Sequence, residues 1–166
     1  EGRPGAGLRA LGARPGHPVL LLPGLMGTQL RVWDSPKSGW IDQLLWMDVG
    51  KVRMPAALKG NRGSAVTEEE TAKTIRRREQ FARHIMLAHD GLSDPPGVVV
   101  RPVRGIDGVA QVVDGLVSVE DSGFRRIVDG LREVGYTPEN LAAVGYDWRL
   151  SCKHLEERDG TLSEIR

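Results

Sequence analysis

Cysteine is nearly absent from this chain of 166 residues. Its single thiol, Cys152, excludes a disulfide within the chain and a cysteine-rich metal site. No pattern around it is typical of an activated thiolate, so we interpret Cys152 as a small residue after a strand rather than as a nucleophile. The sequence predicts no metal and no cofactor.

Long apolar runs and a strong net charge are missing as well. The longest apolar run, Val19 to Leu22, is far shorter than the ~18 residues of a membrane span. The net charge of +1 indicates neither nucleic acid nor an acidic partner. Hydrophobic residues make up 40% and charged residues 27%, which is typical of a folded globular domain. The chain begins at Glu1 without an initiator methionine or a signal peptide, so we expect a piece of a longer protein.

What the sequence does contain is a series of strand and helix patterns. A continuous apolar run predicts a buried strand over Pro18–Pro23, followed by a turn at Gly24–Gly27. Further strands are predicted at Gly97–Val103 and Asn140–Tyr146. Apolar residues at steps of three and four predict an amphipathic helix over Gly123–Gly135. Strand, helix and strand in this order favour an α/β fold with a parallel sheet.

The remaining segments are less regular. Residues 1–16, rich in glycine and arginine, are predicted to be a flexible lead-in rather than a packed element. The apolar spacing in Trp40–Val52 predicts a helix with one wide apolar face. The charged segment Lys59–Arg83 also suits a helix, because its acids precede its bases. His84 and His89 are five residues apart, the wrong spacing for a metal on one helical face, so we expect both in a loop or at the surface.

The glycine turn at Gly24–Gly27 is the feature that best suits catalysis. In hydrolase sheets, the turn after an early strand supplies a backbone N–H to the oxyanion hole, which stabilises negative charge on the reacting carbonyl oxygen. A tight turn flanked by glycines aims such a donor better than a side chain does. An ordinary connection between a strand and a loop explains the same residues, and the turn alone leaves both interpretations open.

Four segments carry a more specific signal. They are HPVLLLPGLMGTQLRVW at residues 17–33, LLWMDVGKV at 44–52, DGLSDPPGVVVRPVRG at 90–105 and GFRRIVDGLREVGYTPENLAAVGYDWRLS at 123–151. In this order they resemble the lecithin–cholesterol acyltransferase family, which includes phospholipid:diacylglycerol and phospholipid–sterol acyltransferases. YDWRLS is the most specific piece, and together with TQLRVW it looks closest to the plant-type phospholipid–sterol branch. The resemblance covers roughly residues 17–166 and is weakest over 55–90.

The resemblance implies an α/β-hydrolase fold, of which these residues would form the N-terminal part of the parallel sheet. A partial hydrolase domain would then span residues 17–166, with a lid-like insertion at about 33–95. In this family a Ser–Asp–His triad takes an acyl group from a phospholipid as an acyl-enzyme. The acyl group then passes to a sterol or to diacylglycerol.

The resemblance also assigns roles to residues near the turn. The backbone N–H of Met26 would be the oxyanion donor, and Leu25 and Trp46 would contact the substrate. Trp46 falls in the region of the family's membrane-facing lid. The alternative for Trp46, a core aromatic on an amphipathic helix, stays open.

Asp147 and Arg149 invite a catalytic interpretation, which the resemblance does not favour. In the family the triad acid and histidine come later in the chain. An acid beside an arginine at a strand exit is more often a structural ion pair, which here would steady the rim of the site. We expect Trp148 to pack beneath the site.

The chain departs from the family pattern in one respect: it has no Gly-x-Ser-x-Gly. The nucleophile would follow one further strand after a helix predicted over Leu155–Arg166, so the triad would lie outside these residues. We therefore expect a lipid O-acyltransferase as the full-length parent and no activity from this chain alone. The alternatives are a phospholipase A-type hydrolase, with water as acceptor, and an inactive truncated protein that binds lipid surfaces.

Expected partners follow from the same resemblance. They are a phospholipid acyl donor, a sterol or diacylglycerol acceptor, and a membrane or lipid-particle surface, with no nucleic acid. The resemblance also implies an endomembrane location such as the endoplasmic reticulum, or another membrane-associated one.

Overall fold

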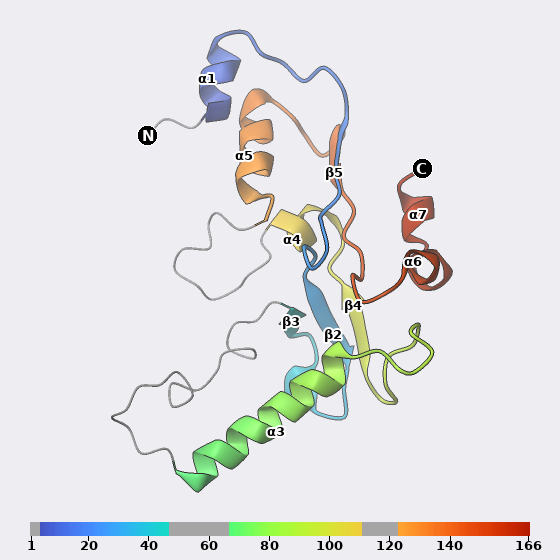
Figure 1. Cartoon of the computed structure of the whole chain (residues 1–166). Coiled ribbons are helices and arrows are strands. Elements are labelled where there is room, and N and C mark those ends of the chain that lie inside the picture. Colours follow the sequence, from blue (N-terminus) through green and yellow to red (C-terminus); the bar gives the residue numbers. More distant parts are fainter. Residues whose placement is uncertain (1–3, 47–66, 111–122) are drawn as a thin grey trace.

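A computed structural model describes residues 4–46, 67–110 and 123–166 (Figure 1). In these residues the strands form two sheets, the parallel pair β1–β5 and the antiparallel sheet β3–β2–β4. Helices accompany both, so the chain has an α/β fold. No helix of the described residues is long and apolar enough to cross a membrane.

The parallel pair joins β1 (Val19–Leu21) to β5 (Leu141–Ala143), with Val19 opposite Leu141. Helices α4 (Gly105–Ala110) and α5 (Arg125–Val134) precede β5 in the chain, and α5 ends at Gly135, where φ is 121°. A small core forms here from buried side chains of both strands and both helices: Leu21, Val109, Val128, Leu141 and Ala143. The predicted strand–helix–strand order is confirmed.

The prediction of a buried first strand is wrong in part. Leu20 is 45% exposed and Leu22 just beyond β1 is 52% exposed, whereas Leu21 is buried. Side chains alternate between the two faces of a strand. The helices cover the face that Leu21 occupies, and in the described residues the opposite face of β1 is open to solvent.

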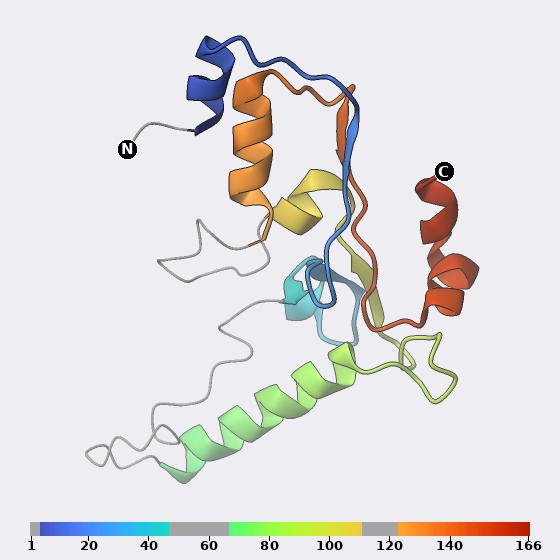
Figure 2. The same cartoon turned by 45° about the horizontal axis from the view of Figure 1, so that its top comes forward.

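The antiparallel sheet comprises β2 (Leu30–Asp34), β3 (Leu44–Trp46) and β4 (Val99–Pro102), with the short 3-10 helix η1 (Ser38–Trp40) between β2 and β3. Its core is more completely buried than that of the parallel pair, and consists of Leu30, Val32, Leu45, Val98 and Val100. Helix α3 (Glu68–Ile85) contributes Phe81 and Ile85 from its C-terminal end. Its other end extends away from the sheet in both views (Figures 1 and 2).

The helix predicted over Trp40–Val52 is wrong for the described part of that range. Leu44–Trp46 form strand β3, which pairs with β2. Asp42 turns the chain with φ 63°, which ends any helix before it is established. Residues 47–52 lie outside the described residues.

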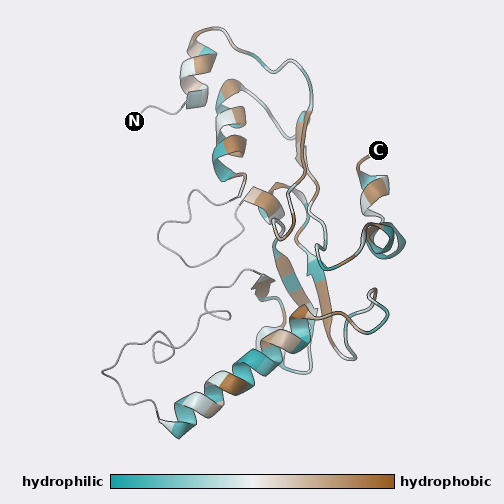
Figure 3. Ribbon diagram, viewed as in Figure 1, coloured by the Kyte–Doolittle hydropathy of each residue, from teal (hydrophilic) through white to brown (hydrophobic). Residues whose placement is uncertain are grey.

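The charged helix is confirmed from Glu68 onward, and residues 59–66 lie outside the described residues. Thr67 caps its N-terminus in a capping box: its hydroxyl accepts from the Glu70 N–H, and the Glu70 carboxylate accepts from the Thr67 N–H. Three glutamates in the first turn complement the helix dipole. Figure 3 shows that α3 is mainly hydrophilic along its length.

The N-terminal segment differs from the expected flexible lead-in. Residues Pro4–Ala10 form α1, which lies beside α5 in both views (Figures 1 and 2). A Cβ at Gly5 would come within 2.3 Å of the Gly130 carbonyl oxygen. The Ala6 N–H donates to the Glu133 carboxylate at 3.2 Å. Packing against a neighbouring helix therefore orders a segment whose composition indicates a loop.

The predicted C-terminal helix is confirmed as two pieces, α6 (Cys152–Asp159) and α7 (Thr161–Glu164). Gly160 separates them in the left-handed conformation. Ser151 caps α6 through its hydroxyl, which accepts from the His154 N–H. Cys152 is exposed in the first turn of α6.

Candidate active site

The glycine turn predicted after the first strand is present. The Gly27 N–H donates to the Gly24 carbonyl oxygen at 3.0 Å, which closes the turn. Met26 occupies the left-handed region, with φ 64°. That conformation costs a non-glycine residue about 1–2 kcal/mol. A Cβ at Gly27 would lie 2.9 Å from the Gly24 carbonyl oxygen, so this position requires glycine.

Trp46 holds the strained residue in place. Its indole Nε1 donates to the Met26 carbonyl oxygen at 2.9 Å. Trp46 is the last residue of β3, so the hydrogen bond joins the antiparallel sheet to the turn after β1. The hydrogen bond therefore fixes the Met26–Gly27 peptide, which follows the Met26 N–H in the turn.

The exit of β5 packs against the same place. The Trp148 ring meets the Trp46 ring edge to face, with centroids 5.0 Å apart. Trp148 Nε1 donates to the Thr28 carbonyl oxygen at 3.2 Å, and the buried Thr28 hydroxyl accepts from the Tyr146 N–H at 3.1 Å. The structure thus brings together Met26, Trp46 and Trp148, which come from three of the four segments that carry the family resemblance.

The Met26 peptide can serve an external acceptor. In the part of the chain that the structure describes, the Met26 N–H donates to no acceptor. Met26 is 41% exposed and Leu25 is 75% exposed, so the turn faces outward. A backbone donor that is fixed, exposed and unused is what an oxyanion hole requires.

Asp147 and Arg149 form the expected ion pair, and the structure extends it into a buried network. Both Arg149 Nε and one terminal nitrogen donate to the Asp147 carboxylate, at 2.8 and 2.6 Å. The same terminal nitrogen lies 3.0 Å from the Asp94 carboxylate, and Arg158 donates to Asp147 at 2.6 Å. Arg149 also donates to the carbonyl oxygens of His84 and Val100. The network therefore fastens the exit of β5 to α3 and β4.

The electrostatics of this network are structural rather than acid–base. Burial raises the pKa of Asp147, but hydrogen bonds and charges from Arg149 and Arg158 outweigh burial and leave that pKa below its usual value. Burial likewise opposes the charge of Arg158, yet Asp159 and Asp147 raise the pKa of Arg158 overall. Both groups stay ionised at neutral pH, so neither exchanges a proton readily.

The prediction of His84 as a surface or loop residue is wrong, whereas His89 is exposed in a turn as predicted. His84 is 1% exposed in the last turn of α3 and stacks on Trp40, with ring centroids 4.5 Å apart. Its Nε2 lies 3.0 Å from the Ser35 hydroxyl, and its Nδ1 lies 2.6 Å from the Gln80 carbonyl oxygen. The sequence did hold a signal, since Phe81 and Ile85 flank His84 on the apolar face of the helix.

Other side chains of the network carried no signal in the sequence. Asp94 is 55 residues from Arg149 and Arg158 is 11 residues from Asp147, and only the tertiary structure joins them. Among the described residues, no group of three or more His, Cys, Asp or Glu side chains could hold a metal ion.

Comparisons with known proteins agree with this geometry. The family model of lecithin:cholesterol acyltransferase matches residues 70–165, more than half of the chain. Because this match covers more than half of the chain, the chain belongs to the lecithin:cholesterol acyltransferase family. Its α/β fold agrees with that family. The matched range includes Asp147, Trp148 and Arg149 but begins after the Met26 turn and Trp46.

Individual relatives extend the match over most of the chain. The phospholipid:diacylglycerol acyltransferase of Schizosaccharomyces pombe is 26% identical over 93% of this chain and 21% of its own length. Phospholipid:diacylglycerol acyltransferase 1 of Arabidopsis thaliana is 26% identical over 98% of this chain and 21% of its own. The Arabidopsis phospholipid–sterol O-acyltransferase is also 26% identical, over 84% of this chain. The chain spans about a fifth of these relatives' length, and identity does not separate the two kinds of acceptor.

Proposed function

We propose that this chain forms the N-terminal part of an α/β-hydrolase-type lipid O-acyltransferase. A serine from outside these 166 residues attacks the ester carbonyl of a phospholipid, forms the acyl-enzyme and releases the lysophospholipid as an alcohol. The hydroxyl of a sterol or diacylglycerol then attacks the acyl-enzyme and loses its proton, and the serine is regenerated.

The Met26 turn is the observation that carries this proposal. Negative charge develops on the carbonyl oxygen in both steps, and the Met26 N–H donates to it. Trp46 donates at 2.9 Å to the Met26 carbonyl oxygen, which belongs to the next peptide, and so anchors the turn immediately after the donor. A donor fixed in advance stabilises the transition state without reorganising during the reaction.

The antiparallel sheet supports an insertion at about residues 33–95 within a hydrolase domain of residues 17–166. Strands β2 and β4 border that range and pair with each other, with Val32 opposite Val100. The chain therefore leaves the hydrolase domain and returns to it on two neighbouring strands, β2 and β4. Trp46, which belongs to it, contacts the turn directly, and together with the exposed Leu25 it lines the path of the acyl chain.

The buried network of Asp147 and Arg149 steadies the rim of this site. Trp148 lies between that network and Trp46, because it follows Asp147 in the chain and packs against the Trp46 ring. The same machinery with water as acceptor would be a phospholipase A. We propose that the protein acts at an endomembrane such as the endoplasmic reticulum. The names of the relatives include a phospholipid, and a phospholipid donor would lie in such a lipid surface.

The test uses two glycines of one turn in the full-length parent protein. Gly27→Ala places a Cβ 2.9 Å from the Gly24 carbonyl oxygen and opens the turn. We expect the rate of acyl transfer to fall about 100–1000-fold, as on loss of one oxyanion donor. Gly24→Ala is the matched control, because no atom lies within 4 Å of its Cβ. Equal rates for the two variants would contradict the role of the turn.

The acceptor is read from the same assay. With a phospholipid labelled in its acyl chain, label in sterol ester or triacylglycerol supports the transferase. Label released only as fatty acid assigns the hydrolase instead. The 166-residue chain alone should give neither product, since it lacks the nucleophile.

A further inference from the structure

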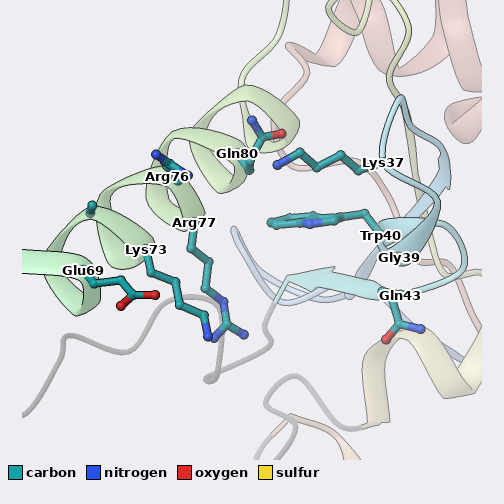
Figure 4. Close-up of a pocket in the computed structure, with 10 residues that line it drawn as sticks. Lys37, Gly39, Trp40, Gln43, Glu69, Lys73, Arg76, Arg77 and Gln80 are labelled. Atoms are coloured by element: carbon teal, nitrogen blue, oxygen red, sulfur yellow. The ribbon is translucent and has the colours of Figure 1, made fainter.

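A hollow of about 810 Å³ lies between α3 and the segment that contains η1 (Figure 4). It lies on the antiparallel sheet's side of the molecule, away from the parallel pair. Its lining is dominated by one sign of charge. Four cations border it, namely Lys37, Lys73, Arg76 and Arg77, against a single acid, Glu69. We call this hollow the basic groove.

The cations of α3 lie along one stripe of the helix. Residues 69, 72, 73, 76, 77 and 80 recur at steps of three and four, so they share a face and all line the groove. Arg78 lies on the opposite face of the helix and does not line it. A helix that packs against its neighbour normally carries apolar side chains on the face towards it, whereas this face of α3 carries charged ones.

Within the described ranges, the groove cations have no acidic partner. In the described residues, none of the four forms an ion pair or a side-chain hydrogen bond. The arginines of the site behave differently, since Arg101, Arg149 and Arg158 all contact carboxylates. The four like charges of the groove repel one another, and an anion placed between them relieves that repulsion.

The floor of the groove is rigid and aromatic. Trp40 lines it and stacks on the buried His84, which is held by the Ser35 hydroxyl and the Gln80 carbonyl oxygen. In Figure 4 the Lys37 side chain runs alongside the Trp40 ring, and the side chains of Lys73 and Arg77 extend from α3 and end near one another. A tryptophan among unpaired cations, as Trp40 is in the groove, is typical of a surface that meets the interface of an anionic membrane.

We infer that the basic groove binds the phosphate of an anionic phospholipid headgroup at a bilayer surface. Lys73, Arg76 and Arg77 contact the phosphate from the helix and Lys37 from the opposite wall, with Trp40 between them in the groove. Neither the chain's net charge of +1 nor its composition indicates this site, because charge totals do not show which residues share a surface. The inference is independent of the proposed acyl transfer, since it concerns binding alone.

The experiment is vesicle flotation of the 166-residue chain. Vesicles of phosphatidylcholine with phosphatidylglycerol should bind it, and vesicles of phosphatidylcholine alone should not. Rising NaCl should weaken binding. Arg76→Gln should weaken binding about fivefold, the loss expected for one basic residue at an anionic surface, and Lys73→Gln with Arg76→Gln about 25-fold.

Arg78→Gln is the matched control, since it removes the same charge from the next-but-one residue on the far face of α3. We expect it to change binding less than about twofold. Equal losses for Arg76→Gln and Arg78→Gln would mean diffuse attraction and overturn the groove. So would equal binding to both kinds of vesicle.

Two competition experiments distinguish a bilayer from other anionic ligands of the groove. Inorganic phosphate should displace the chain from vesicles no better than NaCl of the same ionic strength. Stronger displacement by phosphate assigns a free anion and overturns the bilayer site. Stronger displacement by a single-stranded oligonucleotide than by soluble anionic polymer of equal charge assigns nucleic acid and overturns it too.

Discussion

The two sheets of this protein differ in how completely they are covered. In the antiparallel sheet, Leu30, Val32, Leu45 and Val100 are each 0% exposed. In the parallel pair, Leu21 is buried but Leu20 is 45% exposed. Both sheets use branched apolar residues of the same kind, so composition does not explain the difference.

The difference reflects what each kind of sheet needs. An antiparallel sheet is stable with one face packed, and α3 and the Trp46–Trp148 pair supply that packing here. A parallel sheet is normally buried on both faces. In the described residues, β1 and β5 are covered on one face only, which agrees with the proposal that they belong to a larger hydrolase sheet.

The largest effect is expected where the two regions are joined. Arg149→Ala leaves the buried Asp94 and Asp147 short of a cation and removes donors to the His84 and Val100 carbonyl oxygens. The free energy of unfolding should fall by about 3–5 kcal/mol, measured by urea denaturation. Arg104→Ala is the control. Its pair with Glu164 is largely exposed, so its loss should be at most about 1 kcal/mol.

A leucine from each sheet sharpens the comparison directly. Leu45→Ala opens a cavity in the antiparallel core and should lower the free energy of unfolding by about 2–5 kcal/mol. Leu20→Ala removes the same atoms from a side chain that is 45% exposed, and its cost should stay below about 1 kcal/mol. Chemical denaturation of both variants measures the difference. Similar costs would show that the outer face of β1 is buried in solution.

Acid should weaken the junction between the regions. The pKa of Asp147 in the folded chain lies below its usual 3.8, so the unfolded chain binds protons first as the pH falls. The stabilisation from Asp147 is therefore complete above about pH 4 and is lost as the pH falls through the lowered folded pKa. Urea denaturation at a series of acidic pH values measures the slope. Asp147→Asn should make it shallower, and an unchanged slope would contradict the role of Asp147.

The smallest effect is expected at the start of α3. Thr67→Ala removes the capping hydroxyl and should lower stability by about 1 kcal/mol. Thr71→Ala, one turn later, removes a hydroxyl that bonds only to the Thr67 carbonyl oxygen, and should change stability little. Thermal denaturation followed by circular dichroism measures both. A larger loss from Thr71→Ala would contradict the capping role.

Local pattern was sufficient for much of the fold. The apolar run at β1, the apolar steps of three and four in α5 and the charge order of α3 all appear in the sequence, because each element satisfies its own backbone and one packed face. Strand β3 was missed because the apolar spacing over residues 40–46 suits a helix as well as a strand. Its pairing with β2 settles the choice. Helix α1 was missed because α5, more than a hundred residues away in the chain, orders it.

The candidate site, like the fold, could be predicted from the sequence only in part. Family resemblance pointed to Met26, Trp46 and Trp148 as separate residues, and the contacts between them follow only from the fold. The Asp147–Arg149 pair is visible in the sequence because the two residues are neighbours. Asp94 and Arg158 are not visible, since nothing in their local sequence distinguishes a buried ion pair from a solvated charge.

The sequence by itself determined the turn of glycines, the order of strand, helix and strand, and the family to which the chain belongs, because these depend on residues close together in the chain. Only the tertiary structure decided that an indole from β3 binds the Met26 carbonyl oxygen, that one arginine ties α3, β4 and β5 together, and that four cations face one hollow. Those features require side chains from distant segments to meet. The free energy that brings them together comes from the burial of the two cores, which no short segment contains.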